Sequence, residues 1–219
     1  MQIGIIGAGF ISRALAKNLL AAGHTVMLSN SRGPQTLRSA AAALRCQVGT
    51  AEEAARFGEV VAVAIPMSNW QDLPTAALKG KVVIDIMNHY PERDGPIAEL
   101  DSGGLTTSQL IQQHLAGAKV VKAFNAIMAN DLEKNPRPVG SPERKALPVA
   151  GDDAQAKAQV AALVEQVGFD VVDTGSLADS WRFERARPGY CIPTDKATLA
   201  ATIANTGRAS FVGEYSWRK

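Results

Sequence analysis

The chain of 219 residues has few cysteines, few aromatic side chains, little excess charge and no long apolar run. Its two cysteines, Cys46 and Cys191, lack the CxxC or Cys/His spacing of metal sites, so we predict neither a metal site nor a disulfide framework. The net charge of +2 is too small to indicate nucleic acid or an acidic membrane surface as a partner. No apolar stretch approaches the roughly 20 residues of a membrane span. These absences favour a cytoplasmic protein with reduced thiols.

What the sequence does contain is typical of a globular protein with a full core. Hydrophobic residues make up 46% of the chain and charged residues 20%. Alanine and valine dominate the apolar set, whereas aromatic residues contribute only 5%. Small apolar side chains allow helices to pack closely on a sheet, so this composition favours layered α/β structure.

Strand-like apolar runs alternate with helical patterns along most of the chain. The continuous apolar runs are typical of parallel strands covered on both faces. They predict an α/β fold with a doubly wound, mostly parallel sheet of about seven or eight parallel strands. We predict a main domain over residues 1–190, followed over 191–219 by a helix and an aromatic tail. The predicted strands are Ile3–Ile6, Thr25–Ser29, Gln47–Val48, Val60–Ile65, Val82–Ile86, Val120–Phe124, a run ending near Val149, and Val171–Val172.

The stretch "IGIIGAGFIS", from Ile3 to Ser12, lies between the first strand and the first helix. Gly7 and Gly9 match the start of a GxGxxG turn, with Ser12 in place of the third glycine. In such a turn the first glycine makes the bend, the second lets the backbone approach a pyrophosphate, and the helix amides point at the phosphates. The position of the turn predicts a Rossmann-type dinucleotide site, although a glycine pair in an ordinary strand–turn–helix has the same pattern.

The acid that normally follows such a turn is missing. NAD-binding folds place Asp or Glu about 20 residues further on, where it accepts hydrogen bonds from the ribose. This chain has Asn30, Ser31 and Arg32 in that region. A 2′-phosphate requires a cation and hydrogen-bond donors instead of a carboxylate. We therefore predict NADP(H) as the cofactor, the alternative being an exposed polar loop with a solvated arginine.

Six segments together resemble the NADPH-dependent coenzyme F420 reductases, and the cytoplasmic domain of membrane ferric reductases is similar. The resemblance extends from the first strand to about Tyr190. The segments are "IGIIGAGFIS", "GHTVMLSNSRGP", "VVAVAIP", "VVIDIMN", "VVKAFNAI" and "VAGDDAQAKAQVAALVEQVGFDVVDTGSL".

The resemblance implies that all these segments line one cleft at the carboxyl ends of the strands. It implies that pyrophosphate is held by Gly7, Ala8, Gly9, Phe10, Ile11 and Ser12, and the 2′-phosphate by Ser31 and Arg32. It also implies that Ala64, Ile65 and Pro66 border the ribose and nicotinamide, with Asn88, Ala123 and Asn125 near the nicotinamide and its redox partner.

A catalytic group beyond the cofactor is not evident. Tyr90 and Tyr190 lack the lysine of a Tyr-x-x-x-Lys pair, which leaves Asn88, His89 and Asn125 as candidates. Transfer of a hydride between NADPH and a flavin-like ring depends on alignment more than on acid–base groups. We therefore predict an NADP-dependent oxidoreductase with a small-molecule acceptor: F420, a flavin, a quinone-like compound or a ferric chelate. The alternative is a non-catalytic NADP(H)-binding redox sensor or a partner-docking subunit.

The last nine residues are unusually aromatic, with Phe211, Tyr215 and Trp217. Exposed apolar patches commonly mark interfaces. We expect this tail to pack on a second subunit of a homodimer or over the cleft, the alternative being packing on its own domain.

Overall fold

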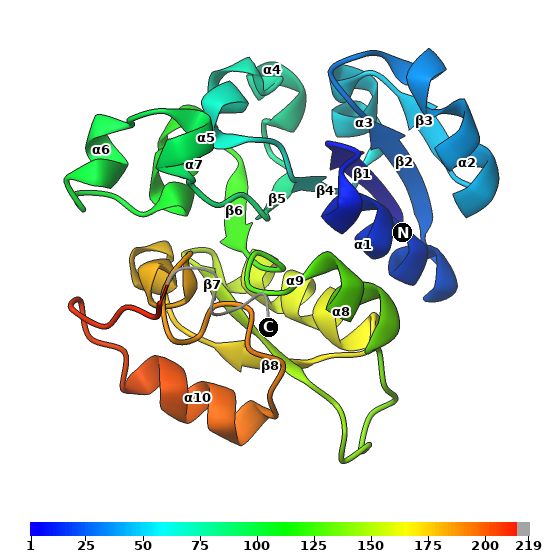
Figure 1. The fold of residues 1–219 in the computed structure, drawn as a ribbon. Helices are drawn as coiled ribbons and strands as arrows, with labels where there is room; N and C mark the ends of the chain where they lie inside the picture. Colours follow the sequence, from blue (N-terminus) through cyan, green and yellow to red (C-terminus); the bar gives the residue numbers. More distant parts are fainter. Residues whose placement is uncertain (214–219) are drawn as a thin grey trace.

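The computed structural model describes residues 1–213, and its centre is one eight-stranded sheet with the strand order β3-β2-β1-β4-β5-β6-β7-β8 (Figure 1). This order reverses between β1 and β4, as in doubly wound dinucleotide-binding folds. The predicted α/β class with a mostly parallel sheet is therefore confirmed. The strands are β1 Gln2–Ile6, β2 Thr25–Ser29, β3 Gln47–Gly49, β4 Val60–Val63, β5 Val82–Asp85, β6 Lys119–Lys122, β7 Ala146–Gly151 and β8 Asp170–Asp173.

The helices cover both faces of this sheet. The α-helices are α1 Phe10–Ala21, α2 Arg38–Leu44, α3 Ala51–Phe57, α4 Thr75–Leu78, α5 Pro91–Asp94, α6 Ala98–Asp101, α7 Thr107–His114, α8 Ala129–Lys134, α9 Ala154–Gln166 and α10 Lys196–Ala204. Three short 3₁₀ helices are η1 Pro34–Leu37, η2 Met67–Asp72 and η3 Leu177–Phe183.

Strand β4 explains why the central strands are apolar along their whole length. Val60 and Ala62 belong to the core cluster that also contains Leu15 of α1, whereas Val61 and Val63 face the opposite cluster with Leu110 of α7. Successive side chains of a strand point to opposite faces. Because each face is covered by helices, every position of this strand has to be apolar.

One feature of the sheet differs from the prediction. Strand β7 is antiparallel to β6, with which it forms only two residue pairs, and parallel to β8. The expectation that all seven or eight strands are parallel was therefore wrong. All six residues of β7 are buried, and an apolar strand covered on both faces has the same sequence pattern in either direction. The pattern therefore could not reveal the reversal.

Several helix ends follow the sequence signals. Thr50 and Glu53 form a capping box on α3, and Asp153 caps α9 by accepting a hydrogen bond from the amide of Ala156. Gly23 follows α1 with φ +86°, the left-handed conformation that glycine favours at this position. Pro34 begins η1, after which the chain continues into α2.

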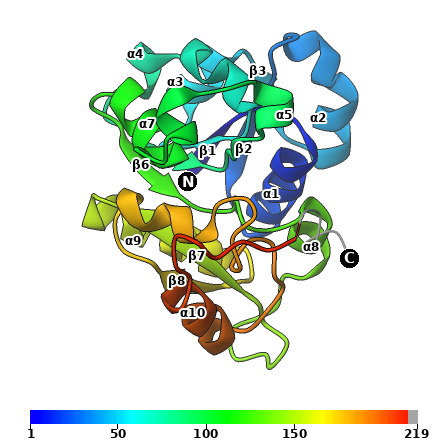
Figure 2. The ribbon, with the colours of Figure 1, turned by 60° about the vertical axis from the view of Figure 1, so that its left-hand side comes forward.

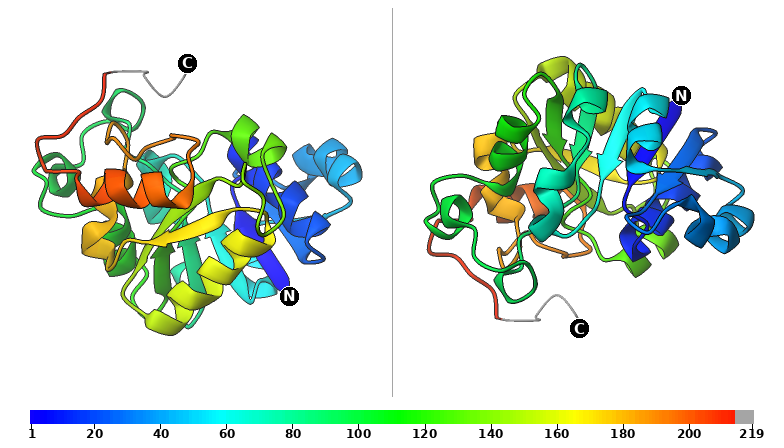
Figure 3. Two further views of the ribbon diagram at one scale, coloured as in Figure 1. Left: turned by 90° about the horizontal axis from the view of Figure 1, so that it is seen from below. Right: turned by 90° about the horizontal axis from the view of Figure 1, so that it is seen from above.

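The part of the chain from α8 to α10 lies below strands β1 to β5 in the views of Figures 1 and 2, and the left view of Figure 3 shows it from below. A third core cluster joins Phe183 and Tyr190 to Leu199 and Ile203 of α10. Phe211 is exposed, while Tyr215 and Trp217 lie outside the described residues. The division at residue 190 remains a prediction. Among residues 1–213, we find no helix with the length and apolar character needed to cross a membrane.

Candidate functional site

Two adjoining cavities form one cleft where the strand order reverses. The first, of about 340 Å³, lies beyond the ends of β1 and β2, and we call it the β1–β2 cavity. The second, of about 350 Å³, lies beyond β5 and β6, and we call it the β5–β6 cavity. The two cavities share Gly9, Ala64, Ile65 and Pro66. A long ligand can therefore pass from one cavity to the other along the β1 turn and the end of β4.

The two positions of the β1 turn, Gly7 and Gly9, hold glycine for different physical reasons. Gly7 has φ +109°, and a Cβ there would lie 2.3 Å from the carbonyl oxygen of Ala64, so the fold itself requires glycine. Gly9 has an ordinary φ of −71°, and a Cβ there would meet nothing within 4 Å. Because Gly9 lines both cavities, its missing side chain leaves space in the cleft without improving the packing of the chain.

The amino end of α1 is available to an anion. No side chain caps it and no acidic residue occupies its first turn, so its amide donors face the cleft uncompensated. Ile11 lines the β5–β6 cavity, and Ala8 lines the β1–β2 cavity. Phe10 is 88% exposed, while Ser12 is fully buried with its hydroxyl unpartnered. The Phe10 and Ser12 side chains therefore do not form the cleft wall.

At the end of β2 the structure brings Asn30 and Ser31 into the β1–β2 cavity. Asn30 is fixed by two contacts: its Nδ2 donates to Thr36 Oγ1 at 2.9 Å, and its Oδ1 accepts from the amide of Arg32 at 3.2 Å. Arg32 is an exposed turn residue beside this cavity and is not part of its lining. None of the ion pairs found within residues 1–213 involves it.

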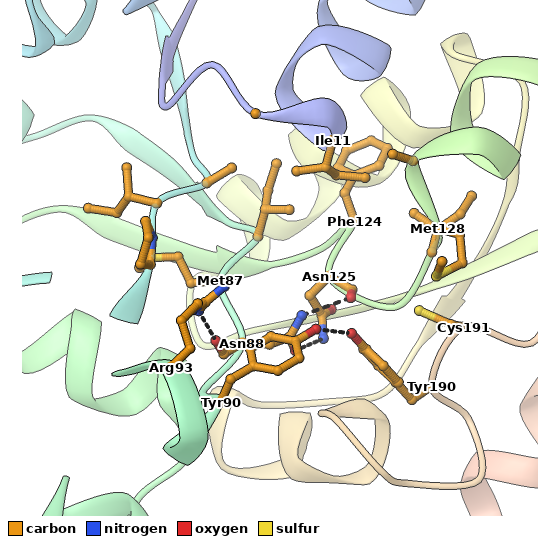
Figure 4. A pocket seen from close by; sticks show the side chains of 17 residues that line it. Ile11, Met87, Asn88, Tyr90, Arg93, Phe124, Asn125, Met128, Tyr190 and Cys191 are labelled. Atoms are coloured by element: carbon orange, nitrogen blue, oxygen red, sulfur yellow. Dashed lines mark hydrogen bonds between the residues drawn. The ribbon is translucent and has the colours of Figure 1, made fainter. Parts of the chain in front are cut away.

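The β5–β6 cavity contains the predicted asparagine pair (Figure 4). Asn88 Nδ2 donates to the backbone carbonyl of Asn125 at 3.0 Å, and Asn125 Nδ2 donates to Asn88 Oδ1 at 3.2 Å and to the carbonyl of Phe183 at 3.1 Å. Asn125 Oδ1 is buried and has no hydrogen-bond partner. Such an acceptor is costly to leave unsatisfied. The pair therefore offers an acceptor at this end of the cleft.

The sequence analysis set Tyr90 and Tyr190 aside for lack of a lysine partner, but the structure places both in this cavity. The hydroxyl oxygens of Tyr90 and Tyr190 lie 2.7 Å apart, and both residues line it together with Arg93, Met128 and Cys191. Burial raises the pKa of Tyr190 well above its usual value. Tyr90 follows Asn88 by two residues and was within reach of sequence reasoning. Tyr190 lies 100 residues further along the chain, and no local pattern connects it to Tyr90.

Two predicted residues lie away from the cavity surface. His89 Nε2 is 2.9 Å from the carbonyl oxygen of Gly95, and the imidazole lines a separate cavity near Phe211. It was named as a catalytic candidate, but the loop after β5 turns its ring out of the cleft. Ala123 is fully buried beneath the cleft, next to Phe124, which does line the β5–β6 cavity.

Two of the four non-glycine residues with positive φ among residues 1–213 line the same cavity. Phe124 has φ +58° and Cys191 has φ +54°, and both line it. Bulky residues rarely adopt such angles, and residues of this kind cluster at binding and active sites.

Within residues 1–213, no three His, Cys, Asp or Glu side chains gather in a way that could hold a metal ion. The amides, hydroxyls and apolar side chains that line the β5–β6 cavity suit an organic ligand.

Comparison with known proteins identifies the family. Residues 2–89 match the model of the coenzyme F420-dependent NADP oxidoreductases. The solved structure of a hypothetical protein from Sinorhizobium meliloti is 31% identical with a TM-score of 0.79, over 90% of this chain and 96% of that chain. The chain belongs to this oxidoreductase family. A candidate F420-dependent NADP reductase from Arthrobacter sp. FB24 is another relative, 26% identical with a TM-score of 0.68, over 82% of this chain and 87% of that chain.

Among curated proteins, the metalloreductase STEAP3 of Rattus norvegicus is 31% identical over 199 residues. The aligned region makes up 88% of this chain but only 38% of that protein. The chain thus spans less than two fifths of the length of this metalloreductase. Membership of the family agrees with the resemblance seen in the six sequence segments.

Proposed function

We propose that this family member is an NADP(H)-dependent oxidoreductase that transfers hydride between NADPH and a flavin-like or F420-like acceptor. The observation that carries the proposal is Gly9, whose missing side chain leaves open space where the two cavities meet. The fold does not require glycine there. An extended ligand whose diphosphate passes close to the backbone does require it.

The residues around the cleft fit such a ligand along its length. The uncapped amino end of α1 is suited to a diphosphate. Ser31 lines the β1–β2 cavity and offers a hydroxyl donor, and Arg32 beside it is a cation without an ion-pair partner among residues 1–213. A 2′-phosphate needs these groups, whereas the free ribose of NAD would need a carboxylate acceptor. This arrangement favours NADP(H).

At the other end, Asn88 and Asn125 hold each other in place, and Asn125 Oδ1 remains as an acceptor for a carboxamide N–H. When bound, NADPH would supply a hydride, which is a proton together with two electrons. The apolar wall made by Ile11, Ile65 and Phe124 excludes water and orients flat rings.

The test is binding followed by turnover. Dissociation constants for NADPH and NADH should be measured by calorimetry, and NADPH oxidation should then be followed with F420, riboflavin, menadione and ferric citrate. Tight NADPH binding with steady oxidation by at least one acceptor supports the proposal. Failure to bind either nucleotide would contradict it.

A redox sensor is the second candidate function. The observation in its favour is that the described residues lining the β5–β6 cavity include no carboxylate, imidazole or ammonium group. A sensor would bind NADPH tightly and oxidise it with none of the four acceptors, which separates it from the oxidoreductase.

A further inference from the structure

The hydroxyls of Tyr90 and Tyr190 meet across the β5–β6 cavity, from two stretches of chain that are far apart in sequence (Figure 4). Tyr90 follows β5, and Tyr190 follows η3 in the C-terminal part. Tyr190 is only 5% exposed, whereas Tyr90 is half-buried and in reach of solvent. The two side chains therefore form one wall of the cavity, and the Tyr90 hydroxyl is the more accessible of their two hydroxyl groups.

The Tyr90 ring is held from two directions by arginines. The guanidinium carbon of Arg93 lies 4.6 Å from the ring centroid and that of Arg185 lies 4.5 Å from it. Each arginine is itself fixed by a carboxylate, Arg93 by Asp94 and Arg185 by Glu92. The position of the Tyr90 hydroxyl is thus determined by several independent contacts, which is the kind of preorganisation that catalytic groups require.

Other proton donors in this cavity are already engaged. The amides of Asn88 and Asn125 bond to each other and to backbone carbonyls. Arg93 donates to Asp94 and to the carbonyl of Asn88. Burial raises the pKa of the Cys191 thiol to about 12, which makes it a poor acid. The two tyrosines carry the hydroxyls among the described lining residues.

We propose that Tyr90 is the proton donor of the reaction, a role that rests on the proposed function. In this role Tyr90 donates to the acceptor while its oxygen accepts a hydrogen bond from Tyr190. The acceptor is then a conjugated carbonyl or ring-nitrogen compound that takes up a proton together with a hydride. A ferric chelate does not fit this role, because a metal centre that gains one electron takes no proton.

The step balances as follows. The C–H bond of the dihydronicotinamide breaks, and its hydrogen and electron pair form a new bond to the acceptor. The O–H bond of Tyr90 breaks, and its proton goes to the acceptor oxygen or nitrogen that gains negative charge. The Tyr90 phenolate regains a proton from solvent, which reaches this half-buried residue. The nicotinamide is oxidised and the acceptor is reduced by two electrons.

The experiment uses the full chain with menadione, riboflavin and ferric citrate as probes. Tyr90→Phe should lower kcat with menadione or riboflavin by roughly 10²- to 10⁴-fold, the usual contribution of a positioned acid. It should leave the dissociation constant for NADPH within twofold and abolish the solvent deuterium isotope effect expected of the wild type. Tyr190→Phe, which retains the Tyr90 proton, should lower kcat by about tenfold and keep the isotope effect.

The outcomes separate this role from the proposed function. Wild-type turnover that Tyr90→Phe leaves within threefold would overturn the role of Tyr90 alone. Reduction of ferric citrate at equal rates by wild type and Tyr90→Phe, without added flavin, would overturn the assignment of the acceptor class. Absence of wild-type turnover with all of these probes and with F420 would overturn both the role and the oxidoreductase function. A thermal melt of each variant shows whether it remains folded.

Discussion

The ammonium nitrogen of Lys122 lies 3.1 Å from a carboxylate oxygen of Asp85, and neither side chain is exposed to solvent. Lys122 also donates to Thr107 Oγ1 at 2.8 Å and to the carbonyl of Met87, while Asp85 accepts from Ser108 Oγ at 2.5 Å. The pair thereby joins β5, β6 and α7 directly beneath the segment that leads to Asn88.

Removal of one member of this pair should be strongly destabilising. We expect Lys122→Met to lower the free energy of unfolding by about 3–5 kcal/mol, because it leaves the Asp85 charge buried without compensation. Urea unfolding measures the loss. The double variant Lys122→Met/Asp85→Leu removes both charges and should recover part of it. A single variant as stable as the wild type would show that the carboxyl group is not buried as a charge.

The β1 turn allows a matched comparison of two glycines. Gly9→Ala should unfold like the wild type, because its Cβ meets nothing, whereas Gly7→Ala should be destabilised by its contact with the Ala64 carbonyl and by its positive φ. Gly9→Asp should remain folded and lose NADPH binding, since a side chain and a negative charge would both meet the diphosphate. Calorimetric titration of folded Gly9→Asp that returned wild-type affinity would remove the turn from the site.

Arg32 should distinguish the two nucleotides. A charge-assisted contact is worth roughly 1.5–3 kcal/mol, and each 1.4 kcal/mol corresponds to about tenfold in affinity. Arg32→Ala should therefore weaken NADPH by about ten- to a hundredfold and leave NADH nearly unchanged. Asn30→Asp should weaken NADPH further by repulsion. If Arg32→Ala weakened both nucleotides equally, the arginine would not be recognising the 2′-phosphate.

The pKa of Cys191 predicts how the stability of the protein changes at alkaline pH. Burial raises the pKa of its thiol in the folded chain to about 12, from an ordinary value of 9.0. Between these values the unfolded thiol loses its proton while the folded thiol keeps it, so stability falls as pH rises, by at most about 1.4 kcal/mol per pH unit. Urea unfolding from pH 8 to pH 11 should show a shallower decline for Cys191→Ala. Parallel curves for variant and wild type would contradict the assignment.

The C-terminal tail tests the predicted homodimer. The exposed ring of Phe211 lies 4.0 Å from the guanidinium carbon of Arg187, which donates to the carbonyls of Arg208 and Ser210. We expect deletion of Gly207–Lys219 to convert a dimer to a monomer, or to change turnover if the tail covers the cleft. Light scattering and NADPH oxidation measure both. No change in mass, melting temperature or turnover would exclude both arrangements.

The sequence was most informative where a local pattern has a single physical cause. The turn at Gly7 and Gly9 and the central strands each follow from a few adjacent residues. The direction of β7 and the approach of Tyr190 to Tyr90 do not, because both depend on how distant segments pack. His89 was predicted near the site because it follows a strand. Its position in the sequence did not determine the direction of its side chain, which points out of the cleft.

The two cavities of the cleft draw on different parts of the chain. The β1–β2 cavity is built from residues no later than Leu73, whereas Tyr190 and Cys191 in the wall of the β5–β6 cavity come from more than a hundred residues later. The family model matches residues 2–89, the stretch that contains the whole of the first cavity. Under the proposed function, we expect substitutions at Tyr190 and Cys191 to affect the redox acceptor more than the choice of nucleotide.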